Sequence, residues 1–247
     1  MEKLADIGVF GGSGFYQFLE DIKEVKVDTP YGMPSDSLFI GKIGNHRVAF
    51  MPRHGRTHSI LPHMINFRAN VWAMKHVGCT RVISPCAAGS LQKHVEPGHF
   101  VICDQFVDWT DGRKSTFFEG PTCYHPSPAE TYCPELRELA IKTAKDLGIT
   151  VHETGTVVVI NGPRFSTKAE SKFFTSLSAI REVSSAYLSL SIFLPEILIP
   201  ACASSSLEFH MMYSAYKLNK QGDNIQCIPF PILNQFIVPC PVLTAAS

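Results

Sequence analysis

Short apolar runs and amphipathic stretches alternate along the first 177 residues of the chain. The apolar runs predict strands, and the stretches with apolar residues on one side predict helices. The predicted strands are Asp6–Phe10, Lys23–Thr29, Ser37–Gly41, His46–Met51, Arg81–Ser84, Phe100–Val107 and Thr156–Ile160, with a hairpin across Ile43-Gly44-Asn45. The predicted helices are Ile65–Val77 and Pro134–Leu147. Strands that alternate with helices indicate an α/β fold, with a central mixed β-sheet flanked by helices.

The composition changes after Leu177. Sixteen of the 17 glycines lie in residues 1–177, whereas the last 70 residues hold only seven charged residues and ten serines. The apolar run Val183–Pro195 is 13 residues long and stops at Glu196, short of the roughly 18 residues that a membrane span needs. We therefore divide the chain into a core over residues 1–177 and a divergent segment of unknown structure over residues 178–247.

Charge and cysteine content narrow the classes of function. The chain has 22 basic and 22 acidic residues and no long basic run, so neither nucleic acid nor an anionic membrane is expected as a partner. Its eight cysteines form no C-x-x-C pair, which indicates buried reduced thiols rather than a disulfide framework or a zinc site, with a Cys123–Cys133 pair across a loop as the alternative. The N-terminus lacks an apolar signal segment. These features predict a cytoplasmic protein with a small-molecule partner.

Three loops hold residues suited to binding one anion. In Gly11-Gly12-Ser13-Gly14 the glycines let backbone N–H groups approach an anion, and the serine adds a hydroxyl donor. Arg53 offers a guanidinium fork, and the adjacent His54 offers a charge-assisted donor. The small-residue turn Cys86-Ala87-Ala88-Gly89-Ser90 follows a predicted strand, at the place where α/β proteins bind ligands. Phosphate is the simplest anion that suits all three loops.

Each loop also has a plainer interpretation. The first is by itself more simply a tight turn, the second a solvated basic loop, and the third a case of ordinary close packing. A metal bound by His54, His58 and His63 is the other alternative, but no cysteine or carboxylate stands at ligand spacing, so no metal site is predicted. A nicotinamide-dependent oxidoreductase would rest only on the glycine-rich strand end, which does not match G-x-G-x-x-G.

Seven blocks of residues occur in the order seen in methylthioadenosine phosphorylases, which are members of the purine nucleoside phosphorylase superfamily. The chain resembles that family from Asp6 to Ser176 without a large gap. The blocks are Gly11-Gly12-Ser13-Gly14, Pro52-Arg53-His54-Gly55-Arg56, Asn66-x-x-Ala69-Asn70-x-Trp72-Ala73, Cys86-Ala87-Ala88-Gly89-Ser90-Leu91, Asp104-Gln105-x-x-Asp108, Tyr132-Cys133-Pro134 and Gly162-Pro163-Arg164-Phe165-Ser166.

The resemblance implies a trimeric α/β enzyme that uses inorganic phosphate to cleave the N-glycosidic bond of methylthioadenosine or a related purine nucleoside. No metal or organic cofactor is implied. The residues that it places around phosphate are Ser13, Arg53, His54, Cys86 and Ala87, the last through its backbone. It further implies that His125 reaches the sugar and alkylthio pocket of a neighbouring subunit and that Phe165 packs against the nucleoside.

The chain also departs from the family pattern. Cys86 stands where many relatives have Thr, and Asn161 stands where relatives carry Glu before Gly-Pro-Arg-Phe. The family's Met-Thr-x-x-Pro-Glu segment, which contacts ribose and phosphate, does not appear after Leu177. Its Thr-Asp-x-Asp segment, which assists the purine N7, is also missing, and Asp223 is the only aspartate in that part of the chain. Losing such general-acid help typically costs roughly 10²- to 10⁴-fold in rate.

Two hypotheses about activity therefore stay open, and no catalytic residue is assigned. The chain is either an active phosphorylase with an unrecognised substitute for the purine site or a catalytically impaired member of the family. In the second case it keeps the phosphate loops, and its last segment comes from alternative splicing, a frameshift or a misread coding sequence.

Overall fold

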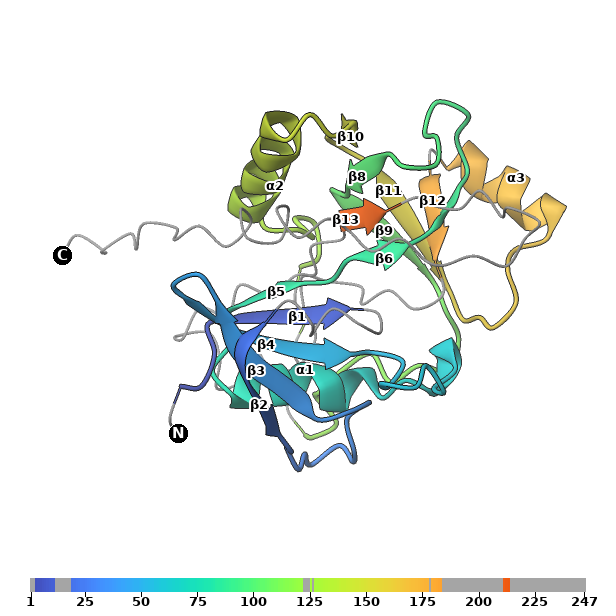
Figure 1. Cartoon of the computed structure of the whole chain (residues 1–247). Helices are drawn as coiled ribbons and strands as arrows, with labels where there is room; N and C mark the ends of the chain where they lie inside the picture. The colour runs from blue at the N-terminus through green and yellow to red at the C-terminus, as the bar shows by residue number, and fades with distance from the viewer. Residues whose placement is uncertain are drawn as a thin grey trace.

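A computed structural model describes residues 3–11, 19–121, 125, 127–177, 179–183 and 211–213, with residues 180–183 and 211–213 described by their backbone alone. Short strands and helices alternate along the chain (Figure 1), so the predicted α/β class is confirmed. Most of the divergent segment over residues 178–247 lies outside the described residues, and so does Ser13. Within the described ranges, no helix is long and apolar enough to span a membrane.

The strands are short, and several of those that the sequence pattern did not predict span only two residues. The elements in chain order are β1 (Ile7–Gly11), β2 (Glu20–Val25), β3 (Leu38–Ile43), β4 (His46–Pro52), η2 (Pro62–Met64), α1 (Phe67–His76), β5 (Arg81–Ile83), β6 (Cys86–Ala87), β7 (Gly89–Ser90), β8 (Phe100–Ile102), β9 (Gln105–Trp109), α2 (Pro134–Asp146), β10 (Val151–His152), β11 (Thr156–Ile160), α3 (Lys168–Ser176), β12 (Ala179–Val183) and β13 (Met211–Tyr213).

The central sheet has five strands in the order β2-β3-β4-β1-β5 and is mixed, as predicted. β1 runs parallel to both β4 and β5, whereas β3 pairs antiparallel with β2 and β4. The predicted hairpin is confirmed between β3 and β4, and Gly44 in its turn has a φ of 56°, which suits glycine. The three parallel strands end at one edge of this sheet.

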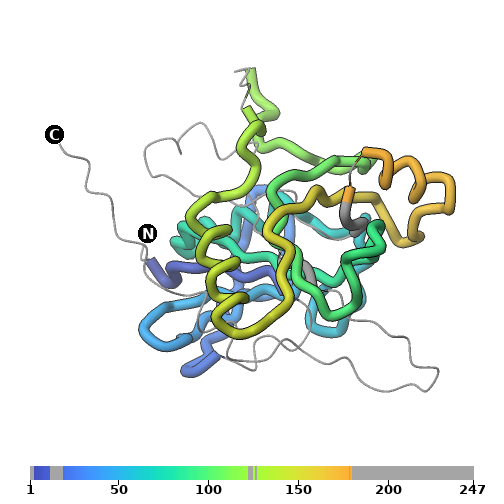
Figure 2. Tube along the Cα trace, turned by 90° about the horizontal axis from the view of Figure 1, so that it is seen from above, coloured from blue at the N-terminus to red at the C-terminus, as the bar shows by residue number. Residues whose placement is uncertain are grey.

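Two smaller sheets have the strand orders β10-β8-β13-β6 and β7-β12-β11-β9. The single strand predicted over Phe100–Val107 is wrong, because the chain leaves one small sheet after Ile102 and enters the other at Gln105. Asp104 lies at this crossing, and its Oδ1 accepts a hydrogen bond of 2.9 Å from the backbone N–H of Gly155. Both views place α2 and α3 at opposite ends of the small sheets (Figures 1 and 2).

The helices begin and end where their terminal residues favour it. Asn66 caps α1 by accepting a hydrogen bond of 3.2 Å from the backbone N–H of Ala69, and Gly78 beyond its end has a φ of 95°. α2 starts with Pro134, which needs no hydrogen-bond partner there. α3 starts with a capping box between Thr167 and Glu170.

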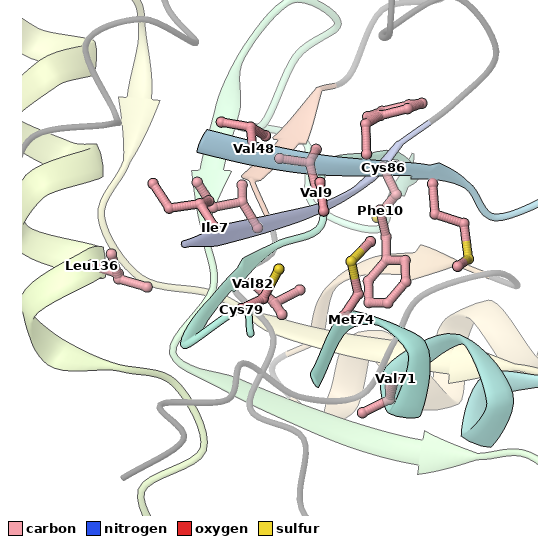
Figure 3. Close-up of a cluster of buried hydrophobic side chains, with 14 of the residues drawn as sticks. Ile7, Val9, Phe10, Val48, Val71, Met74, Cys79, Val82, Cys86 and Leu136 are labelled. Carbon is pink, nitrogen blue, oxygen red and sulfur yellow. The ribbon is translucent and has the colours of Figure 1, made fainter. Parts of the chain in front are cut away.

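The core lies against β1, which is buried along its whole length. Figure 3 shows Val9 and Phe10 of β1 among side chains from β4, α1 and β5. A Cβ atom at Gly8 would come within 3.0 Å of the Met74 sulfur, so glycine allows α1 to approach the strand closely. The cysteines that the structure describes, Cys79, Cys86, Cys103 and Cys133, are buried free thiols, as predicted for them.

Candidate functional site

The carboxyl edge of β1, β4 and β5 brings together two of the three predicted anion loops. Gly11 at the end of β1 lies opposite Pro52 at the end of β4, and Arg53 follows directly. Cys86 follows β5, the other neighbour of β1. This is the edge at which parallel α/β sheets bind ligands. The third loop begins at Gly11, and Ser13 within it is outside the described residues.

Arg53 ties the ends of these strands together. Its side chain is only 6 % exposed, and its Nη1 donates hydrogen bonds of 3.0 Å to the carbonyls of Phe10 and of Pro85. Its backbone N–H donates to the Gly11 carbonyl at 3.2 Å. One buried guanidinium therefore sets the spacing between the chain leaving β1 and the chain leaving β5.

Among the residues that the structure describes, no acidic side chain pairs with the charge of Arg53. Within the described part of the chain, the interactions of its guanidinium are with backbone carbonyls rather than with a carboxylate, and its buried Nε has no hydrogen-bond partner. A buried charge costs several kcal/mol unless an opposite charge or hydrogen bonds compensate it. The guanidinium is thus suited to an anion at the strand ends.

His54 is held as a neutral imidazole beside this charge. Its Nδ1 is 2.8 Å from the Ile60 carbonyl, which can only accept, so Nδ1 carries the proton and Nε2 keeps its lone pair. Burial, together with the charges of Arg53 and His58, lowers the pKa of His54 to about 4, against the raising effect of the bond to Ile60. The predicted charge-assisted donor is therefore an uncharged ring near pH 7 in the structure, and the positive charge of this edge belongs to Arg53.

Cys86 and Ala87 form β6 rather than the tight turn that the sequence predicted. Cys86 is buried, Ala87 is exposed, and both pair in parallel with the backbone of β13. Gly89 and Ser90 form β7, which pairs with β12. Small residues thus let the chain pass between the two small sheets next to the Arg53 edge, and the expectation of a turn is corrected.

Phe165 and His125 lie on the surface. Phe165 is 79 % exposed in the loop between β11 and α3, and His125 is exposed as well. The hydrogen bonds of Arg53 and His54 go to Phe10, Pro85 and Ile60 rather than to either residue. These hydrogen bonds therefore do not connect Phe165 or His125 to the Arg53 edge.

A salt bridge supports the loop that carries Phe165. Arg164 donates to Glu170 through both terminal nitrogens, at 2.8 and 2.7 Å, and also to the Phe165 carbonyl at 3.0 Å. Hydrogen bonds from Arg164 and from the Thr167 N–H lower the pKa of Glu170 to about 2. The sequence blocks contain Arg164 but did not indicate this pairing.

The structure reveals one further arrangement, at the end of β11, that the sequence did not predict. Asn161 exchanges hydrogen bonds with the backbone of Asp111, and Arg113 donates to the carbonyl of Ile160. Asn161 stood out only as a departure from a family pattern, and Arg113 carries no motif. Their partners are backbone atoms about 50 residues away in the chain, so no local signal could identify the contact.

The described residues offer no alternative centred on a metal. Among them, no group of three or more His, Cys, Asp or Glu side chains is arranged to hold an ion, and His54, His58 and His63 form no such group. His54 and His58 instead stack, with ring centroids 4.5 Å apart.

Comparison with known proteins gives consistent matches over most of the chain. Residues 6–188 match the family model described as the phosphorylase superfamily. The chain is 52 % identical over 181 residues to the S-methyl-5'-thioadenosine phosphorylase of Thermofilum pendens, covering 72 % of this chain and 69 % of that protein. It is also 52 % identical over 175 residues to the purine nucleoside phosphorylase of Streptomyces coelicolor, covering 68 % of this chain and 62 % of that protein.

A solved structure extends the match to the fold. The chain is similar to the methylthioadenosine phosphorylase of Schistosoma mansoni in complex with adenine, with a TM-score of 0.71 and 33 % identity. That alignment covers 84 % of this chain and 81 % of the other. The chain thus spans about two thirds of the length of the two sequence relatives and matches the fold of the solved one.

Proposed function

The chain belongs to the phosphorylase superfamily, and we propose that it catalyses the phosphorolysis of 5'-methylthioadenosine or a closely related purine nucleoside. The products are the free base and 5-methylthioribose-1-phosphate, or the corresponding sugar phosphate. The name of the Thermofilum relative favours methylthioadenosine as the substrate. The name of the Streptomyces relative, purine nucleoside phosphorylase, favours other purine nucleosides as the alternative. The proposed core is residues 1–177, with residues 178–247 as a divergent segment.

The observation that carries the proposal is the buried, unbalanced Arg53 at the carboxyl edge of three parallel strands. We propose that phosphate binds here between Arg53, His54, Ser13 and the chain at Cys86 and Ala87. A phosphate anion would compensate the charge of the guanidinium and occupy donors that have no acidic partner among the described residues. This support is electrostatic, and it does not depend on the nucleoside.

The chemistry needs an anion at such a place. The bond between the sugar C1' and the base nitrogen breaks with its electron pair going to the base, and the sugar gains positive charge. A phosphate oxygen then forms the new bond to C1', and the base takes up the proton that the phosphate loses, so that atoms and charge balance. An anion fixed under the sugar stabilises the developing charge and is also the nucleophile, so positioning and electrostatics act together.

We further propose that Phe165 and His125 contact the nucleoside. Phe165 presents an exposed ring suited to packing on a base or sugar, and His125 would act across the interface of a homotrimer. The protein would act in the cytoplasm with phosphate as co-substrate and without a metal or organic cofactor. The reduced cysteines of the described residues support the compartment.

A second candidate function follows from the divergent segment. The family's ribose and purine motifs do not appear after Leu177, where Asp223 is the only aspartate. Without an acid at the purine, the base leaves as a poor anion, which typically slows the reaction by roughly 10²- to 10⁴-fold. The alternative is an impaired phosphorylase that still binds phosphate.

Turnover of the full-length chain decides between these functions. The enzyme is incubated with methylthioadenosine, with and without phosphate, and adenine release is measured beside a full-length relative. Phosphate-dependent release supports the proposed reaction, and its rate separates the active from the impaired form. If neither turnover nor a phosphate-induced rise in melting temperature is seen, both candidates fail.

A further inference from the structure

Asn161 joins two loops that are far apart in the sequence. It lies directly after β11, and its Nδ2 donates a hydrogen bond of 2.9 Å to the Asp111 carbonyl. Its Oδ1 accepts one of 3.3 Å from the Asp111 N–H. One side chain therefore satisfies both backbone groups of Asp111, in the way that a neighbouring strand would.

The amide of Asn161 makes this pair of bonds because it holds a donor and an acceptor side by side. A carboxylate accepts at both oxygens, so it would leave the Asp111 carbonyl without a donor and place negative charge against it. Glu, which the resembled family carries at this position, cannot make the same contact. The departure at Asn161 thus corresponds to a specific interaction in this chain.

Arg113 adds a second attachment between the same loops. Its Nη2 donates to the carbonyls of Ile160, at 3.0 Å, and Asn161, at 3.4 Å. Its guanidinium lies over the Phe67 ring of α1 at 4.7 Å, which fixes the arginine from the other side. We call Asn161, Asp111 and Arg113 the loop latch.

The latch lies between the two segments that we assign to the nucleoside. On one side the chain continues from Asn161 to Phe165, whose ring is 79 % exposed and so takes its position mainly from the backbone of its loop. On the other side it continues from Arg113 towards His125. Loosening the latch would shift the loop that carries Phe165 without touching Arg53 or His54.

We propose that Asn161 is a positioning residue that sets nucleoside affinity by holding these two loops together. The inference rests on the proposed function, because it assigns Phe165 and His125 to the nucleoside. It predicts a change in one Michaelis constant only. KM for the nucleoside should rise when the latch is weakened, while KM for phosphate and kcat should change little.

The test compares full-length Asn161→Asp, Asn161→Glu and Asn161→Gln with the wild type. Loss of one hydrogen bond should raise the nucleoside KM about threefold to tenfold in the Asp and Glu variants, and less in Gln, which keeps both amide groups. Deuterium uptake should increase in peptides that cover residues 108–113 and 160–166. Asn45→Asp makes the same chemical change in the exposed β3–β4 turn and should alter neither measurement.

The outcomes separate the latch from the reaction. An Asn161→Glu enzyme that equals or exceeds the wild type, or an Asn161→Asp enzyme with unchanged KM and uptake, overturns the positioning role. A rise in KM for phosphate by the same factor also overturns it. If the wild type shows no turnover, the proposed function fails. The role of the latch is then tested by deuterium uptake in the same peptides and by adenine affinity from calorimetry, which Asn161→Asp should change if the latch positions the loops.

Discussion

The carboxyl edge of β1, β4 and β5 and the pair of loops joined by Asn161 are built in opposite ways. At the sheet edge, Arg53 and His54 are 6 % and 8 % exposed, and their partners are backbone groups of the surrounding strands and loop. At the loops, Phe165 is 79 % exposed, and the backbone is held by side chains from distant positions. Strand register determines the first region, and a few polar contacts determine the second.

This difference has a thermodynamic consequence. Substitutions at the sheet edge should lower the stability of the fold and anion binding together, because the same buried bonds serve both. Substitutions at the loops should change nucleoside recognition while leaving stability within about 0.5 kcal/mol, as is usual for exposed positions. The following experiments measure the stability of the fold, ligand binding or both, so each can contradict this difference between the two regions.

Arg53→Ala should have the largest effect. It removes the donor shared by the Phe10 and Pro85 carbonyls and the charge proposed to hold phosphate. Loss of a charged hydrogen bond of roughly 1.5–3 kcal/mol should raise KM for phosphate by roughly 10- to 150-fold and also lower the melting temperature. Steady-state kinetics at varied phosphate and thermal unfolding measure the two effects.

Arg53→Lys is the matched control for charge. It keeps a cation but lacks the planar fork, so part of the phosphate affinity should survive. If Arg53→Ala unfolds at the wild-type temperature and still shows the full phosphate-induced shift, Arg53 contributes neither to the fold nor to an anion site.

His54 should make the stability of the same region depend on pH. Its pKa is about 4 in the fold and 6.5 in the unfolded chain, so the unfolded state binds the proton more readily. The free energy of unfolding should therefore fall by about 2 kcal/mol as the pH drops from 6.5 towards 4, and His54→Gln should lose that part of the slope. Urea unfolding of both proteins across this range isolates the contribution.

The same pH dependence of the unfolding free energy can be measured with phosphate present. A bound anion beside His54 would favour the imidazolium and raise its pKa, so the slope should become shallower in phosphate than in chloride at equal ionic strength. If the two buffers give the same slope, the anion does not bind near His54.

The sequence predicts features that neighbouring residues determine, and it fails where a feature depends on residues far away in the chain. The β3–β4 hairpin was predicted from the turn at Ile43-Gly44-Asn45, and α1 from the spacing of apolar residues over Ile65–Val77 with Gly78 just beyond. The strand over Phe100–Val107 was wrong because its break at Asp104 depends on Gly155, 51 positions away. Likewise β6, β7 and β10 are two residues long, too short for any periodicity to appear.

In the candidate site, too, the sequence could indicate some features and not others. Arg53 and His54 could be singled out because they lie next to each other at a strand end, within a block of basic residues. The neutral state of His54 could not be predicted, since it depends on burial and on the Ile60 carbonyl. Arg113 could not be found either, because its hydrogen-bond partners are backbone carbonyls at Ile160 and Asn161.

Phe165→Ala should have the smallest effect on the fold and the most selective effect on binding. The ring is 79 % exposed, so its removal leaves no cavity and the melting temperature should stay near the wild-type value. A ring that packs on the nucleoside should contribute about 1–1.5 kcal/mol, so the nucleoside KM should rise about tenfold while KM for phosphate stays constant. Met33→Ala, at another side chain that is 85 % exposed, controls for loss of exposed apolar surface. Equal increases in both Michaelis constants would show that the two regions are coupled, and the contrast between a buried anion edge and an independent nucleoside loop would then be wrong.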